Sequence, residues 1–227
     1  MLIHPWDAPR DDAEWQHWLA AHDFGQLAVN GLPGDPPHVQ PMLPQVLNCV
    51  RAGETPSVYD AAGRGPRGDV IAHLSRHNPL WPALESHPEV LLSVVDDYVF
   101  VPGPWQAPED TPPEHGVPTS FYAAVQLRCS AAVVDDPHEK AELLNRQSTH
   151  FQPDVGSPGA AVGAAPYGRL LSGIRGLRLE VTDVRAKFKY ASQKPEAVQD
   201  RIAAGLAERS GPRDAEARAH HLRRRPA

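Results

Sequence analysis

The sequence predicts an α+β protein in which a closed or split antiparallel β-barrel carries peripheral helices. Two long runs of β-branched, aromatic and apolar residues, 89–101 (EVLLSVVDDYVFV) and 120–134 (SFYAAVQLRCSAAVV), are the strongest strand signals. Long strand patterns occur without a regular helix between each pair, so parallel crossovers are not implied. Closing an antiparallel sheet into a barrel buries such strands and limits their exposed edges.

The first half of the chain predicts one helix followed by strands. Acidic residues open a helix that runs through His22, and its apolar stripe, formed by Trp15, Trp18 and Leu19, is expected in the core. The other elements predicted here are strands at 24–30, 38–50 and 57–59, turns at 31–37 and 51–56, a glycine-rich connection at 63–68, and a short helix at 80–87.

The second half alternates long strands with helices. The elements predicted after 120–134 are a helix at 136–151, a loop at 153–163, a short helix at 166–172, a strand at 177–184 that continues towards 187–190, and a helix from Pro195 through Glu208. Leu143 and Leu144 should point inward from the first of these helices. We therefore place the barrel domain at residues 1–210. The Arg- and His-rich segment 211–227 is expected to be a flexible basic tail.

Composition narrows the function classes. With 227 residues, 41% hydrophobic and 22% charged, the chain can bury a substantial core as one large domain or two small ones. The net charge of −6 argues against a generic nucleic-acid binder. Cys49 and Cys129 are too few for a disulfide framework, which suits a reducing cytoplasm. No apolar run could span a bilayer and no export signal begins the chain, so a cytoplasmic protein without a membrane partner is expected.

The stretch 69–81 (DVIAHLSRHNPLW) carries two histidines, His73 and His77, four residues apart. On a helix they would share one face and could enter one pocket. Imidazole is a common ligand of transition metals and of haem iron. The alternative interpretation is a surface helix with two solvated histidines.

Four ordered motifs carry a resemblance. They are HxxP at 38–41, HxxxxNPLW at 73–81, VPT at 117–119 and KFKxxSQ at 187–193. Together they resemble the PaiB-like branch of the FMN-binding split-barrel family, over roughly residues 1–210. The resemblance implies a split β-barrel, usually a homodimer, with its cofactor at or near the subunit interface. No helix-turn-helix with a basic recognition face is evident.

Three departures from the flavin-type pattern point to a subgroup. Residues 102–106 (PGPWQ) stand in place of an SWY-like run, 117–122 (VPTSFY) in place of VPTWNY, and 189–194 (KYASQK) in place of KLSQN. In these respects the chain looks like the haem-dependent piperazate synthases. That resemblance implies heme b as cofactor and N5-hydroxy-L-ornithine as substrate, cyclised to L-piperazic acid with loss of water. FMN is the alternative cofactor, in an oxidoreductase, a flavin reservoir or a transcriptional regulator.

The resemblance makes His73 the expected axial ligand of the haem iron, with His77 as second choice. Thr119, Lys187 and Lys189 are expected near the cofactor, and the two lysines face the same way on a strand. They could meet haem propionates, an FMN phosphate or the substrate carboxylate. A solvated strand end is the alternative interpretation of these lysines.

Substrate and proton-transfer residues are also expected. Arg76 is a candidate for the substrate carboxylate, and Ser120 could donate a hydrogen bond. Tyr122 and His115 are the catalytic candidates, with Glu114 as an alternative base. Finally, Cys129 is a thiolate ligand in principle, although a cysteine in an alternating strand is more often a small core residue.

Overall fold

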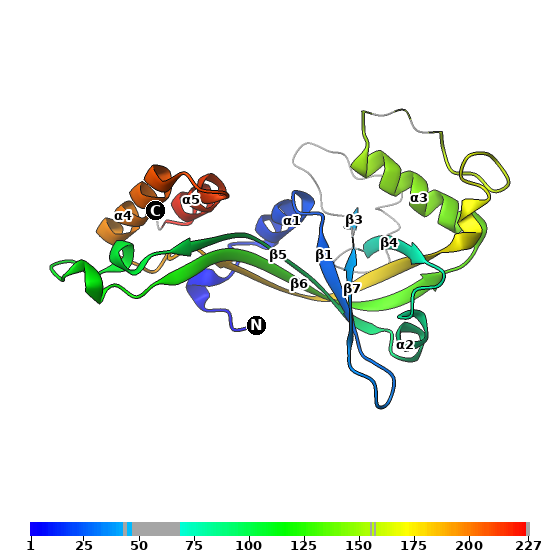
Figure 1. Ribbon diagram of the computed structural model, residues 1–227, viewed down its shortest axis with the longest axis horizontal. Coiled ribbons are helices and arrows are strands. Elements are labelled where there is room, and N and C mark those ends of the chain that lie inside the picture. The colour runs from blue at the N-terminus through cyan, green and yellow to red at the C-terminus, as the bar shows by residue number, and fades with distance from the viewer. Residues whose placement is uncertain (43–44, 47–68, 155, 157, 226–227) are drawn as a thin grey trace. The chain divides into compact units, whose positions relative to one another are not determined.

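Figure 1 shows the computed structural model, which describes residues 1–42, 45–46, 69–154, 156 and 158–225. Within these residues seven strands form one sheet in the order β2-β1-β5-β6-β7-β4-β3. The strands are β1 (Gly25–Val29), β2 (His38–Met42), β3 (Gln45–Val46), β4 (Asp69–Ser75), β5 (Glu89–Val101), β6 (Thr119–Val134) and β7 (Ile174–Lys189). β1 pairs antiparallel with β2 and β5, as β4 does with β3 and β7. The antiparallel α+β fold is thus confirmed.

Helices connect and flank the strands. The α-helices are α1 (Asp12–Ala20), α2 (Trp81–Ser86), α3 (Pro137–Phe151), α4 (Glu196–Arg209) and α5 (Asp214–Arg223), and the short 3-10 helices are η1 (Pro5–Asp7), η3 (Gly103–Gln106), η4 (Pro113–His115) and η5 (Leu170–Gly173). None of the helices in the described part of the chain is long and apolar enough to cross a bilayer.

Most predicted elements are confirmed near their predicted bounds. The strongest strand signal, 89–101, is β5 itself, and the two patterns at 177–184 and 187–190 belong to the single strand β7. The predicted strand at 38–50 is described only as β2 and β3. The predicted turn at 51–56, the strand at 57–59 and the connection at 63–68 lie outside the described residues, as does Cys49.

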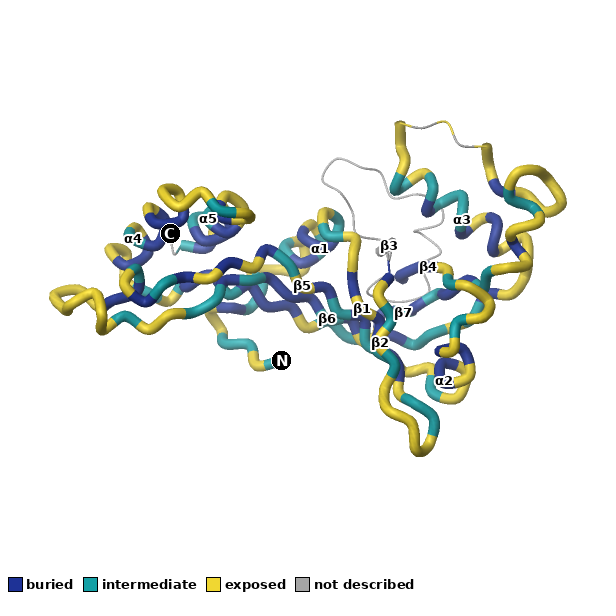
Figure 2. The backbone as a smooth tube through the Cα atoms, in the orientation of Figure 1, coloured by how far each residue is buried: buried dark blue, intermediate teal, exposed yellow. Residues whose placement is uncertain are grey.

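The chain divides into two compact units. Unit 1 comprises Met1–Trp15, Val95–Val125 and Arg185–Ala227, and unit 2 comprises Gln16–Val94 and Gln126–Val184. Each unit is discontinuous in sequence because the long strands β5, β6 and β7 contribute residues to both. Figure 2 shows buried segments along these strands and exposed ones in the loops.

In unit 2, helix α3 approaches the sheet closely at a glycine. Gly176 of β7 stands directly opposite His73 of β4. A Cβ added at Gly176 would lie 3.0 Å from Leu143 Cδ1 of α3, so the missing side chain leaves room for the helix. Leu143 is buried as predicted, with 6% exposure. Gln147 lies one turn further along the same face of α3.

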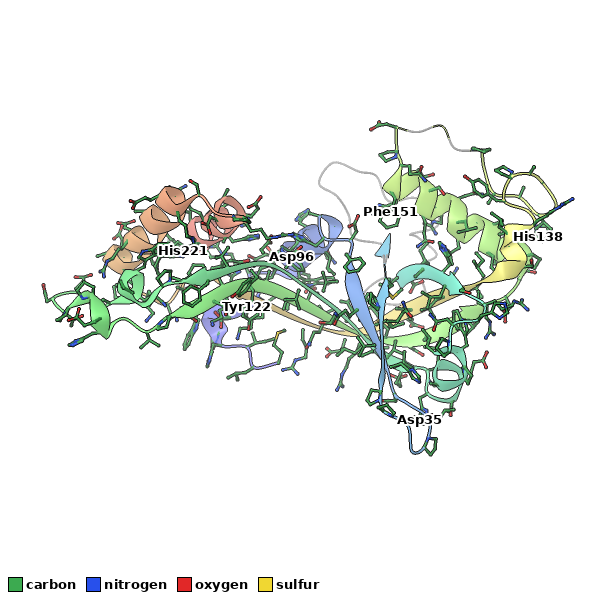
Figure 3. All side chains as sticks on the ribbon, viewed as in Figure 1. Asp35, Asp96, Tyr122, His138, Phe151 and His221 are labelled. Atoms are coloured by element: carbon green, nitrogen blue, oxygen red, sulfur yellow. The ribbon has the colours of Figure 1, made fainter. Side chains whose placement is uncertain are left out.

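In unit 1, α4 and α5 pack on each other, and a buried imidazole connects them to the sheet (Figure 3). His221 of α5 is 0% exposed. Its Nδ1 lies 2.6 Å from the Tyr190 carbonyl oxygen at the end of β7, and its Nε2 lies 2.9 Å from the Gln199 carbonyl oxygen of α4. The ring also stacks on Phe121, with centroids 5.5 Å apart. His221 therefore joins three elements of unit 1.

The C-terminal segment differs from the prediction. Residues 211–227 were expected as a flexible basic tail, whereas 214–223 form α5 with Ala217, His220 and His221 buried. Charged side chains are held there by specific partners, since the Arg209 guanidinium bonds Asp214 at 2.8 Å and Arg224 bonds Glu14 at 2.6 Å. A basic composition alone does not reveal such pairing, because the partners lie far away in sequence or on another helix.

Replacing His221 with Ala should lower the free energy of unfolding by about 2–4 kcal/mol, because a buried carbonyl group loses its hydrogen-bond donor and a cavity opens. Urea unfolding followed by circular dichroism measures this change. His138→Ala is the matched control, since His138 is exposed in the first turn of α3. That variant should stay within about 0.5 kcal/mol of wild type. Equal stability of the two variants would contradict the role given to His221.

Candidate functional site

The histidine stretch forms a strand and a turn. His73 belongs to β4, and His77 lies in the turn that follows, so the interpretation in which both imidazoles share one helix face is wrong. Val70, Ile71 and Ala72 are buried where β4 pairs with β3 and β7, whereas the His73 side chain is exposed. The two histidines are therefore separate candidates.

His73 is oriented by a glutamine from α3. The His73 Nδ1 lies 2.6 Å from Gln147 Oε1, and Gln147 is buried with 6% exposure. An amide oxygen only accepts, so Nδ1 carries the proton and the lone pair resides on Nε2. Among the described residues Nε2 has no hydrogen-bond partner. Metal-ligating histidines are arranged in this way, with one nitrogen held by an oxygen and the other left to bind.

Arg76 and His77 line a pocket of unit 2 with a volume of about 390 Å³. Its walls also include Trp81, Glu85, Asp135 and Arg175. Arg76, the predicted contact of the substrate carboxylate, therefore lines the same pocket as His77.

The acidic groups of this pocket are already neutralised. Arg175 donates to Asp135 at 2.6 Å, contacts Glu85 at 2.7 Å and lies over the Trp81 ring at 5.0 Å. The hydrogen bond from Arg175 lowers the pKa of Asp135. This arrangement leaves no unpaired carboxylate to hold an ammonium group in the pocket.

A second pocket, in unit 1, brings together three of the predicted residues, Thr119, Lys187 and Lys189. It has a volume of about 440 Å³ and is called here the lysine pocket. The lining residues are His4, Trp6, Asp7, Gln106, Val117, Pro118, Thr119, Phe121, Lys187, Lys189, Ala191, Gln193 and Lys194. Two of the four motifs, VPT and KFKxxSQ, therefore meet around one cavity together with the N-terminal segment.

The two lysines of β7 have different partners. Lys187 Nζ donates to the Leu2 carbonyl oxygen at 2.9 Å and lies 3.5 Å from Asp7 Oδ2. Lys189 Nζ donates to the Thr119 hydroxyl at 2.7 Å, which is a neutral partner. Burial and, to a smaller extent, the nearby Lys187 ammonium lower the pKa of Lys189. Lys189 is therefore the cation of this pair without a carboxylate in contact, among the described residues.

Tyr122 of β6, labelled in Figure 3, lies close to the ammonium groups of both lysines. The Nζ atoms of Lys187 and Lys189 are each 5.7 Å from the Tyr122 ring centroid, within range of a cation–π attraction. The expectation that the two lysines face the same way is confirmed by this shared neighbour. The Tyr122 ring therefore stabilises the ammonium groups of Lys187 and Lys189 on the same face of the sheet.

The N-terminal segment forms the opposite wall of the lysine pocket. The Trp6 ring stacks on His4 at 4.7 Å, and the Trp6 carbonyl oxygen accepts from the Ser192 hydroxyl at 2.7 Å. Asp7 follows with 3% exposure, yet its carboxylate accepts no hydrogen bond from the described residues and has only the 3.5 Å ion pair with Lys187. A buried carboxylate with this little compensation is unusual.

The remaining candidates are scattered. Ser120 is half-buried on β6, while Glu114 and His115 are exposed in η4. Cys129 is 0% exposed, and burial raises the pKa of its thiol to about 12. It is a core residue and not a thiolate ligand. In the described part of the chain, no three His, Cys, Asp or Glu side chains are grouped to hold a metal ion.

Two site residues were missed by the sequence prediction, Gln147 and Asp7. Gln147 meets His73 across 74 positions, a contact that no local pattern carries. Asp7 stands in a polar segment near the chain start, where an acidic residue is ordinarily solvated.

Comparison with known families now adds to this geometry. The family model described as "Putative FMN-binding domain" matches residues 1–183. The chain belongs to this FMN-binding domain family. No curated protein matches the chain by sequence.

Solved structures agree with the split-barrel fold of the family. The FAD- and haem-binding protein from Mycobacterium smegmatis matches with a TM-score of 0.56 and 16% identity, over 87% of this chain and 79% of that one. The conserved hypothetical protein Rv2991 from Mycobacterium tuberculosis gives 0.54 and 13%, over 86% and 95%. The flavocytochrome Anf3 from Azotobacter vinelandii gives 0.51 and 17%, over 80% and 67%. At these identities the likeness concerns the fold alone.

Cys129 should resist thiol reagents in the folded protein. A pKa raised to about 12 keeps the thiol protonated at pH 8, and full burial blocks access. In a Cys49→Ser background, labelling with Ellman's reagent at pH 8 should be negligible in buffer and stoichiometric in denaturant. Rapid labelling of the folded variant would overturn the core assignment.

Proposed function

We propose that this member of the FMN-binding domain family is a haem-dependent piperazate synthase. It would convert N5-hydroxy-L-ornithine into L-piperazic acid and water. The proposal combines the sequence resemblance to piperazate synthases with the arrangement around His73. It names heme b as the cofactor.

The hydrogen bond between His73 and Gln147 is the observation that carries the cofactor assignment. It fixes the proton on Nδ1 and leaves the exposed Nε2 free to ligate. Haem brings four ring nitrogens of its own, so one protein imidazole is enough to hold the iron. The residues present therefore fit a haem ligated through His73, and Gln147 would orient the ligand.

The reaction balances without an oxidant or reductant. The α-amine, once deprotonated, gives its electron pair to N5, and the N–N bond forms. The N5–O bond breaks, and the departing hydroxide takes a proton to become water. Haem, when bound, supplies the Lewis-acidic metal that makes a hydroxylamine nitrogen open to attack.

The protein must supply binding, orientation and proton transfer. We propose Tyr122 for this role, since its ring centroid lies 5.7 Å from the Nζ atoms of Lys187 and Lys189, which line the lysine pocket. His115 remains a proposed proton carrier from η4. Arg76 and Ser120 remain proposed substrate contacts. Thr119 remains a proposed cofactor contact, and Lys187 and Lys189 remain proposed contacts of the cofactor or of the substrate carboxylate.

FMN binding is the second candidate. It is favoured by the family description and by the lysine pocket, where Lys189 and Thr119 could meet a phosphate group. An FMN-dependent oxidoreductase or a regulator would then be the function. The two cofactors differ in absorption, because haem gives a Soret band near ~400 nm and flavin gives two broader bands.

We also propose a cytoplasmic homodimer. Strand β5 leaves Val95, Tyr98 and Phe100 exposed by 60%, 58% and 50%, which is apolar surface that a second copy could cover.

His73→Ala should lose bound haem or shift its Soret band, since the iron loses its protein ligand. Gln147→Leu should weaken haem affinity by about 10–100-fold, because Nδ1 loses the acceptor that orients the ring. Both effects are read by titrating the purified variants with hemin and recording absorption spectra.

His77→Ala is the matched control, a histidine four residues away in the turn after β4. It should bind hemin like wild type. Unchanged haem content and spectrum in His73→Ala would remove the ligand assignment, and flavin bands in the purified protein would favour the second candidate.

Haem-loaded protein should convert N5-hydroxy-L-ornithine labelled with ¹⁵N at both nitrogens into a product in which the two labels are directly bonded. Because the cyclisation needs no net redox change, turnover should continue without an added reductant or oxidant. The ¹⁵N–¹⁵N coupling in the NMR spectrum of the product is the measurement. Absence of turnover by protein with a full haem complement would reject the proposed reaction.

A further inference from the structure

The lysine pocket contains a cation without a carboxylate in contact and a carboxylate without a hydrogen-bond donor, among the described residues. Lys189 donates only to the neutral Thr119 hydroxyl, at 2.7 Å. Asp7 is 3% exposed and keeps only a long contact, 3.5 Å, to Lys187. Both residues line the same cavity of about 440 Å³.

Lys187 does not satisfy either group. Its Nζ gives a hydrogen bond to the Leu2 carbonyl oxygen at 2.9 Å, and this contact fixes the N-terminal segment against β7. At 3.5 Å its distance to Asp7 Oδ2 exceeds the usual N–H···O range, so the Asp7 oxygens keep their capacity to accept. Lys187 therefore holds the segment that carries Asp7 against the lysine pocket, but it does not use the hydrogen-bonding capacity of the Asp7 carboxylate.

A ligand that completes this pocket needs one carboxylate and one ammonium group close together. We infer that the lysine pocket binds the zwitterionic head of an α-amino acid, with Asp7 accepting from the α-ammonium and Lys189 donating to the α-carboxylate. The inference rests on the proposed function only in naming the amino acid as an ornithine derivative. The pairing of charges itself comes from the pocket.

A phosphate ligand fits the pocket less well. A phosphate dianion would meet two ammonium groups but would also approach the buried Asp7 carboxylate, which repels it. The amino-acid head turns the same carboxylate into a favourable partner. The pocket around Arg76 cannot offer this combination, since Arg175 already occupies Asp135 and Glu85.

The rest of the lysine pocket suits the aliphatic part of such a ligand. Val117, Pro118 and Phe121 supply apolar surface, and the stacked rings of His4 and Trp6 close the N-terminal side. A short methylene chain bearing a polar end could lie against these groups.

Isothermal titration of the full-length protein, as purified, with L-ornithine tests the inference. Asp7→Asn and Lys189→Gln should each raise the Kd for L-ornithine by at least about tenfold, because each removes a charged hydrogen-bond partner. Arg128→Gln is the charge-matched control, since Arg128 is exposed on β6 and does not line the pocket. It should change the Kd by less than about threefold.

Ligand analogues assign the two ends separately. 5-Aminopentanoate lacks the α-ammonium group, so Asp7→Asn should leave its Kd unchanged while Lys189→Gln weakens it. Putrescine lacks the carboxylate, so Lys189→Gln should leave its Kd unchanged while Asp7→Asn raises it. Lys189→Arg should restore most of the L-ornithine affinity, and thermal unfolding of every variant separates lost binding from lost folding.

Several outcomes would overturn the inference. They are no binding of L-ornithine to wild type, inorganic phosphate binding more tightly than L-ornithine, or an unchanged Kd in Asp7→Asn. The result is independent of the haem titration. Wild-type protein that takes up haem normally but does not bind L-ornithine rejects this inference alone, and wild-type protein that binds L-ornithine but takes up no haem rejects the cofactor assignment alone.

Discussion

Strand β7 is the constraint on which both candidate sites depend. Its side chains alternate between the two faces of the sheet, so Lys187 and Lys189 share one face while Phe188 and Tyr190 are buried on the other. Its first half pairs with β4 in a register that sets His73 opposite Gly176. A slip of one residue would reverse every one of these side chains. The hydrogen-bonding register of β7 thus determines which of its side chains face the candidate sites.

The two sites use the neighbours of β7 in different ways. In unit 2 the missing side chain at Gly176 lets α3 approach, and Gln147 reaches His73 from the same face of the helix as Leu143. In unit 1 the neighbour is the N-terminal segment, which is fixed by the hydrogen bond from Lys187 to the Leu2 carbonyl oxygen. In both units a strand residue is therefore held by a hydrogen bond to a residue far away in sequence: His73 to Gln147, and Lys187 to Leu2.

The residues assigned to chemistry differ in how visible they were in the sequence. His73, Lys187 and Lys189 stand in motifs whose resemblance to a family implies a cofactor. Their partners Gln147 and Asp7 do not, because their importance comes from being buried beside a group distant in sequence. The same reason explains why 211–227 was predicted as a flexible tail although it contains helix α5.

The sequence by itself determined the antiparallel α+β fold, the long strands and the family. These follow from β-branched runs, period-two alternation and ordered motifs, which are local signals. Tertiary structure alone decided that the two histidines are on a strand and a turn, that Gln147 fixes the tautomer of His73, and that Asp7 faces the lysine pocket. The physical reason is that tautomers, desolvation and charge compensation depend on which groups meet in space, and those meetings join residues that no local pattern relates.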